Sequence, residues 1–114
     1  MTRPDDLRLD DIMGMVAEIA GIVERGRAEF DGDIALRRAL ERCLEIIGEA
    51  AKLLSSDIRQ SIADVDWSEM IRLRDRLSHH YHRVGPALLW VAAERDVPKV
   101  GTAITSWRER RGPA

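Results

Sequence analysis

The sequence predicts an all-α protein, a compact antiparallel bundle of four to six helices that forms one domain over residues 1–114. Along most of the chain, apolar residues recur at steps of three and four, the spacing of one helix face. The alternation of apolar and polar residues that is typical of a half-buried strand is almost absent. Glycine, proline and aspartate separate the periodic segments and mark the expected helix ends.

The first predicted helix runs from about Leu7 to Arg27. Its apolar face consists of Ile12, Met15, Val16, Ile19, Ile22 and Val23. The segment Phe30–Asp33 is the expected break, because Asp31 or Asp33 can cap the helix that follows.

The second predicted helix spans about Ile34 to Leu54. Its apolar stripe consists of Leu36, Leu40, Cys43, Leu44, Ile47, Ala51 and Leu54. Gly48 lies inside this pattern, where glycine costs about 1 kcal/mol of helix propensity relative to alanine. Its presence indicates that another helix approaches closely, either in the same chain or from a second subunit.

Two helix starts follow in the middle of the chain. Ser55 and its neighbours can begin a short helix that runs to about Ala63. Asp66 then reads as the N-cap of a longer helix from Trp67 to about Arg83, with Glu69 placed to reach back to the cap.

The C-terminal part contains two further expected breaks. Gly85–Pro86 ends the preceding helix and starts the next, since proline is tolerated at the first helical position. Val97–Pro98 is expected to break the chain again, before a last helix from about Pro98 to Arg110.

Charge and composition limit the possible functions. The formal net charge is −2, so any RNA contact has to come from a local basic patch or from one formed by dimerisation. The single cysteine, Cys43, excludes an internal disulfide and sits in an apolar run typical of a buried thiol. No apolar run approaches the roughly 20 residues that cross a membrane, and the first residues are polar. These features predict a cytoplasmic protein with no membrane contact.

One segment concentrates side chains that can do acid–base chemistry. The three histidines are His79, His80 and His82, and the only tyrosine, Tyr81, lies among them. The arginines on or near this segment are Arg59, Arg72, Arg74, Arg76 and Arg83. On spacing alone, a solvent-exposed charged helix face explains this cluster about as well as a functional site does.

Helical geometry separates the candidates. On a continuous helix, Met70, Leu73, Leu77, His80 and Val84 share the core-facing sector, which predicts a packed role for His80. Arg74 and His79 fall roughly 140° apart at about 100° per residue. A joint site therefore requires either a distorted helix or a two-fold axis that brings the segments of two subunits into one cleft.

Two kinds of chemistry remain for the cluster. A metal site is disfavoured, because the histidine spacings are one, two and three rather than four and no third ligand is evident. RNA cleavage without a metal needs only a histidine that moves a proton and an arginine that holds the phosphate. DNA would be spared, because it lacks the 2′-hydroxyl that attacks in such a reaction.

Arg74, four intervening residues, His79, one residue and Tyr81 resemble the Arg-x4-6-His motif of HEPN domains, in the Arg-x4-His-x-Tyr form of HepT proteins. The similarity extends to other parts of the chain. These parts are Leu44–Lys52, Asp66–Trp67, Ile71, Leu73, Leu88–Trp90 and Asp96–Pro98. The resemblance covers most of the chain and is weakest in the first 30 residues.

The resemblance implies a HEPN-type helical bundle that forms a homodimer, with two motifs in a composite cleft. It implies a metal-independent endoribonuclease without a cofactor, acting as the toxin of a toxin–antitoxin pair. The implied antitoxin is an MntA-type nucleotidyltransferase that transfers AMP to the motif tyrosine. In this chain Arg74 would bind the RNA phosphate, His79 would be the acid or base, and Tyr81 would be modified.

One residue departs from the family pattern. Asp75 stands where asparagine usually follows the motif arginine, and its negative charge would oppose phosphate binding. Arg72 and Arg76 are expected to support RNA contact and offset this charge, and Arg72 also matches a six-residue spacing to His79. For Glu49 helix capping or a structural pairing is favoured over catalysis. The alternative function is a catalytically weak HEPN binding or regulatory module that partners a nucleotidyltransferase.

Overall fold

The computed structural model describes residues 3–79 and 84–112, and every regular element within these ranges is helical, which confirms the all-α prediction. The elements in chain order are α1 (Arg3–Glu24), α2 (Arg27–Gly32), α3 (Ile34–Leu53), α4 (Ser56–Ser61), α5 (Trp67–Ser78), α6 (Pro86–Val91), the π-helical turn η1 (Ala92–Asp96) and α7 (Val97–Arg111). The last three follow one another without a break and form one rod. If this rod is counted as one helix, the described ranges contain four long helical segments, which are α1, α3, α5 and the rod, and two short helices, α2 and α4. This number agrees with the predicted four to six helices.

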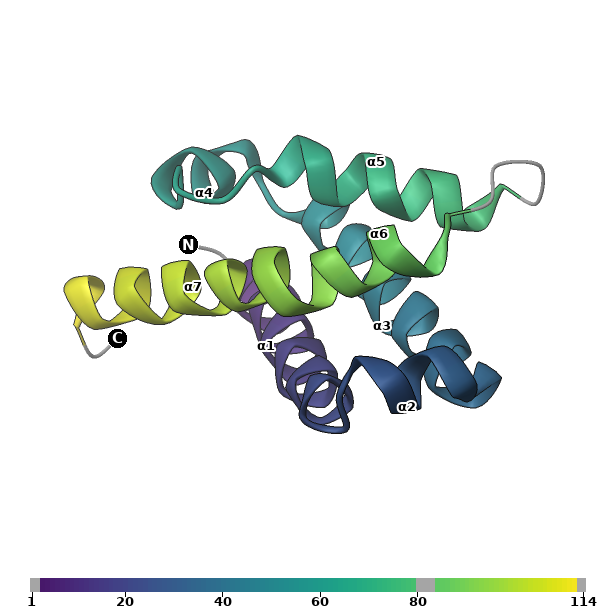
Figure 1. The fold of residues 1–114 in the computed structure, drawn as a ribbon. Coiled ribbons are helices and arrows are strands. Elements are labelled where there is room, and N and C mark those ends of the chain that lie inside the picture. The colour runs from purple at the N-terminus through teal and green to yellow at the C-terminus, as the bar shows by residue number, and fades with distance from the viewer. Residues whose placement is uncertain (1–2, 80–83, 113–114) are drawn as a thin grey trace.

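Helix α3 is the centre of the bundle. It packs against α1 on one side and against α5 on the other, and α1 also contacts α7 (Figure 1). Figure 1 also shows that α5 and the α6–η1–α7 rod run in opposite directions. Within the described part of the chain, no helix has both the length and the apolar character needed to cross a bilayer.

The second predicted helix is confirmed, with α3 ending within one residue of the expected position. The side chain of Asp33 caps its N-terminus by accepting a hydrogen bond from the backbone N–H of Ala35 at 2.9 Å. Cys43 is buried, and burial together with a hydrogen bond to Glu18 raises the pKa of its thiol to about 11. Cys43 is therefore a core residue, as the sequence indicates.

The break after the first helix lies earlier than Phe30–Asp33. Helix α1 ends at Glu24, and Gly26 has a φ of +88°, a left-handed conformation that favours glycine. The chain then forms α2, which completely buries Phe30 against Trp90, with ring centroids 5.3 Å apart. A buried aromatic contact from a distant segment thus makes a helix where the local pattern predicted a turn.

The expected break at Val97–Pro98 is also wrong. The backbone N–H of Val97 donates to the carbonyl oxygen of Ala92, five residues earlier, in the π-helical register. Pro98 has no N–H to donate and would crowd the carbonyl of the preceding turn in a tight α-helix. The wider π turn accommodates the proline near the start of α7, so the rod continues through it.

The two middle helices start as predicted, but α5 ends early. Ser55 caps α4, and the side chain of Asp66 caps α5 by accepting from the N–H of Glu69 at 3.1 Å. The Glu69 carboxylate pairs with Arg72 instead of reaching back to the cap. Helix α5 stops at Ser78 rather than near Arg83, and the next residue has an extended backbone.

Gly48 lies where α3 packs tightly against another helix. A Cβ atom at this position would lie 2.1 Å from the Cβ of Arg74 and 2.9 Å from the carbonyl oxygen of Met70. Both neighbours belong to α5, so the approaching helix comes from the same chain. Because Gly48 has no side chain, the backbone of α3 can pack directly against the stem of the Arg74 side chain on α5.

Replacing Gly48 with alanine is expected to lower the free energy of unfolding by about 1–3 kcal/mol, because the added methyl group overlaps Arg74 and pushes the helices apart. Gly14→Ala in α1 is the matched control, since a Cβ there meets no heavy atom within 4 Å. The free energy of unfolding of Gly14→Ala should rise by roughly 0.5–1 kcal/mol, because alanine has a higher helix propensity than glycine. Urea unfolding followed by circular dichroism measures the free energy of unfolding of both variants. An equal increase in the two variants would contradict a tight α3–α5 contact.

Candidate active site at the C-terminal end of α5

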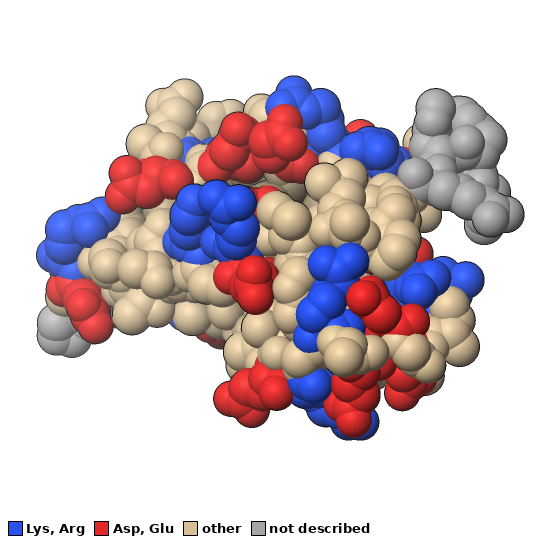
Figure 2. Space-filling view, viewed as in Figure 1, with Lys and Arg blue, Asp and Glu red and all other residues tan. Residues whose placement is uncertain are grey.

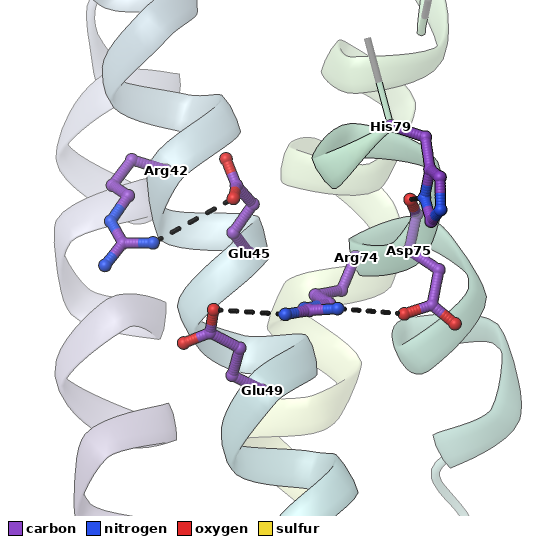
Figure 3. A network of polar contacts seen from close by, with 6 residues as sticks. All are labelled: Arg42, Glu45, Glu49, Arg74, Asp75 and His79. Atoms are coloured by element: carbon purple, nitrogen blue, oxygen red, sulfur yellow. Dashed lines mark hydrogen bonds and ion pairs between the residues drawn. The ribbon is translucent and has the colours of Figure 1, made fainter. Parts of the chain in front are cut away.

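Arg74 lies on the side of α5 that faces α3. Its side-chain stem crosses Gly48, and its guanidinium lies between two carboxylates (Figure 3). Nη1 is 3.2 Å from Oδ1 of Asp75, and Nη2 is 3.5 Å from Oε1 of Glu49. The side chain is 27% exposed, so the guanidinium is held between the helices and still reaches the surface.

Electrostatics keep Arg74 charged. The hydrogen bond that Arg74 donates to Asp75 raises the pKa of its guanidinium, partial burial lowers this pKa, and Glu49 raises it further. The Nε–H of this arginine is buried and has no hydrogen-bond partner in the described part of the chain. Contact with a new anion is therefore left to the two terminal nitrogens.

His79 is the first residue after α5. Its ring atom Nδ1 lies 2.5 Å from the backbone carbonyl oxygen of Asp75. A carbonyl oxygen can only accept a hydrogen bond, so Nδ1 carries the proton. In the neutral ring Nε2 then carries the lone pair and is the atom that can take a proton from a substrate.

Asp75 links the two candidate catalytic residues. Its carboxylate contacts Arg74 and its main-chain carbonyl accepts from His79 (Figure 3). The roughly 140° separation expected on a continuous helix does not apply, because the helix ends before His79 and the backbone there is extended. Of the two options that the sequence leaves open, the change in helix geometry is present in this chain, and the two-fold axis, which needs a second subunit, stays a prediction.

Glu49 was expected to form a structural pair, and its partner is Arg74 itself. Local sequence does not reveal this partner, which lies 25 positions further along the chain. The adjacent Gly48 was the available sign, because it marks where another helix touches α3. A second ion pair on α3, between Arg42 and Glu45 at 3.9 Å, lies near the same contact (Figure 3).

The other two arginines of α5 lie on a different face. Arg72 is exposed and paired with Glu69, and two residues along a helix turn a side chain by about 200° away from Arg74. Arg72 and Arg76 line a groove of about 550 Å³ between α5 and the α6–η1–α7 rod. The guanidinium that contacts the Asp75 carboxylate is therefore that of Arg74, whereas the side chains of Arg72 and Arg76 line the groove on the other face.

Charges of both signs occur on the surface. Figure 2 shows acidic and basic side chains interspersed on the face that it displays, without a continuous basic area. At the site itself, one arginine faces two carboxylates. A phosphate approaching Arg74 in this chain thus meets more negative than positive charge among these three side chains.

Several predicted residues lie outside the described part of the chain. These are His80, Tyr81, His82 and Arg83. The packed role predicted for His80 and the modification predicted for Tyr81 are therefore not addressed by the structure. Among residues 3–79 and 84–112, no group of three or more histidine, cysteine, aspartate or glutamate side chains is arranged to hold a metal ion.

Comparison with known proteins identifies the family. Residues 12–106 match the family model described as "Ribonuclease HepT-like". The chain belongs to the HepT-like family. The matched region contains every helix from α2 to α6 together with the Arg74–His79 segment, and it agrees with the resemblance seen in the sequence.

Individual relatives of this HepT-like chain carry ribonuclease names. It is 34% identical over 95 residues to "Probable ribonuclease HepT" of Thermococcus cleftensis, a match that covers 79% of this chain and 86% of the relative. It is 42% identical over 72 residues to "Putative RNase MJ1380" of Methanocaldococcus jannaschii, with 63% of this chain and 66% of the relative covered. Another protein of that organism, "Putative RNase MJ0125", is 32% identical over 93 residues, or 81% and 80% of the two chains. No solved structure matches the chain significantly.

The geometry at His79 makes a spectroscopic prediction. The neutral ring should be protonated at Nδ1 and unprotonated at Nε2, because the Asp75 carbonyl accepts from Nδ1. Long-range ¹H–¹⁵N correlation spectra above pH 8 distinguish the two nitrogens, and His79→Gln assigns the signal. A ring protonated at Nε2 would contradict the assignment of Nε2 as the basic atom.

Proposed function

We propose that this HepT-like chain is a metal-independent endoribonuclease that acts as the toxin of a HepT/MntA-type toxin–antitoxin pair in the cytoplasm. The observation that carries the proposal is the connection of Arg74 and His79 through Asp75 at the end of α5. Family membership and the ribonuclease names of the relatives support RNA as the substrate class.

The proposed reaction uses the 2′-hydroxyl of the RNA. Nε2 of His79 takes the hydroxyl proton, the freed oxygen attacks the adjacent phosphorus, and the bond from phosphorus to the 5′-oxygen breaks. The leaving oxygen takes up a proton, and the charge added to the phosphate is stabilised by the Arg74 guanidinium. This chemistry needs no metal ion.

A homodimer would complete the site. The reaction uses a base on one side of the phosphate and an acid on the other, whereas the described part of one chain contains a single histidine, His79. A two-fold axis near the end of α5 would supply a second His79 and a second Arg74. The additional arginine would also offset the two carboxylates of each subunit.

The proposed control point is Tyr81. An MntA-type nucleotidyltransferase would transfer AMP from ATP to the tyrosine oxygen and release pyrophosphate. Tyr81 follows His79 by two positions. AMP on Tyr81 would add negative charge and bulk to the segment that contains Arg74 and His79, which would oppose binding of the RNA phosphate.

A second candidate function rests on the same network. Two carboxylates hold Arg74, which favours a catalytically weak HEPN module that binds and regulates its nucleotidyltransferase. This module would bind the partner tightly and leave RNA intact. The cleavage assay separates the two candidates.

In that assay the purified protein should cleave RNA in the presence of EDTA and spare DNA of the same sequence. Arg74→Ala and His79→Ala should each lower the rate by about 10²–10⁴, because each removes a group that acts in the transition state. Arg38→Ala is the matched control, since it removes an exposed arginine of α3 whose ion pair in the described part of the chain is with Glu41 and not with a residue of the site. Full activity of His79→Ala, or complete inhibition by EDTA, would refute the proposed mechanism.

A second prediction concerns the antitoxin. Incubation with the MntA-type enzyme and ATP should attach AMP to Tyr81 and abolish RNA cleavage, as peptide mass spectrometry and the cleavage assay would show together. Tyr81→Phe should keep the cleavage activity and carry no AMP, because phenylalanine lacks only the hydroxyl oxygen to which AMP would be attached. Inhibition of Tyr81→Phe by the partner and ATP would show that control acts elsewhere.

A further inference from the structure

The three charged side chains at the α3–α5 contact do not balance. Arg74 contributes one positive charge, and Asp75 and Glu49 contribute two negative charges. Neither carboxylate is deeply buried, since each side chain is 43% exposed. Contacts of this exposure hold an arginine weakly enough for another anion to compete.

The contacts with Asp75 and Glu49 use Nη1 and Nη2 of Arg74, the same nitrogens that a bound phosphate would need. Nη1 points to Asp75 and Nη2 to Glu49, while Nε is buried. A phosphate that binds with two parallel hydrogen bonds uses two adjacent nitrogens of this group. Because Nε is inaccessible, those nitrogens are Nη1 and Nη2, and the phosphate has to compete with the carboxylates.

The two carboxylates differ in their position. Glu49 projects from α3, the central helix, and anchors the guanidinium across the helix contact. Asp75 lies on α5 beside the arginine and makes the shorter contact, 3.2 Å against 3.5 Å. Asp75 also contacts His79, and it does so through its backbone carbonyl, which does not depend on the side chain.

We infer that Asp75 sets the affinity of the site for RNA, because its carboxylate competes with the RNA phosphate for Nη1 of Arg74. Its backbone carbonyl separately holds His79 in the tautomer with a basic Nε2. The inference rests on the proposed ribonuclease function and names an affinity-determining residue of that site. Affinity and proton transfer are thereby controlled by different atoms of one residue.

The variant Asp75→Asn tests this division. Asparagine has nearly the same shape and keeps the backbone carbonyl, so only the negative charge is lost. KM for a single-stranded RNA should fall about five- to tenfold, while kcat should stay within about twofold. A loss of kcat, or a rise in KM, would overturn the inference.

Binding without cleavage gives an independent measurement. A 2′-O-methyl oligonucleotide keeps the phosphates and lacks the attacking hydroxyl, so its Kd reports affinity alone. Asp75→Asn should lower this Kd about five- to tenfold in the native chain and leave it unchanged in an Arg74→Ala background. The same decrease in both backgrounds would show that Asp75 does not act through Arg74.

Glu69→Gln is the matched control, because it removes the same charge from the same helix at a residue paired with Arg72. Its Kd should change less than twofold, and a decrease equal to that of Asp75→Asn would indicate a general charge effect and overturn the inference. Thermal unfolding should be nearly the same for Asp75→Asn and the native chain, as expected for an exposed pair. A large loss of stability would assign Asp75 a structural role instead.

The outcomes separate the two proposals. If the native chain cleaves RNA and Asp75→Asn leaves KM and Kd unchanged, the ribonuclease function stands and the role of Asp75 is refuted. If the native chain shows no activity and Asp75→Asn gains RNA binding, the role of Asp75 stands and activity of the native chain is refuted. If neither protein binds or cleaves RNA, both proposals fail.

Discussion

The contact between α3 and α5 at Gly48 is the constraint on which the site depends. Because this glycine has no side chain, the stem of Arg74 can pass directly over α3. The guanidinium then lies within reach of Glu49, which an arginine on a more distant helix would not meet. A packing detail with no chemistry of its own therefore determines where the proposed phosphate-binding group is held.

The end of α5 is the second determinant. The helix stops at Ser78 and an extended residue follows, so His79 is no longer held in the helical register of Arg74. The His79 ring then turns back to the carbonyl of Asp75. Asp75 contacts both residues, with its side chain toward one and its backbone toward the other, so charge and tautomer are set at one position.

Local signals predicted much of the fold. The caps at Asp33 and Asp66 lie where the sequence places them, because capping involves only neighbouring residues. The errors occur where distant contacts or register shifts act. Phe30 is helical because Trp90 packs against it, and the rod passes Pro98 because a π turn makes room for the ring.

The sequence by itself determined the helical class, the core stripe of α3, the family and the motif that contains Arg74, Asp75 and His79, since periodicity and spacing are properties of the chain alone. Only the tertiary structure decided which helix Gly48 admits, which carboxylates hold the arginine and which nitrogen of His79 is basic. These depend on contacts between residues far apart in the chain and on the point where a helix ends. Packing sets both, and no local pattern encodes them.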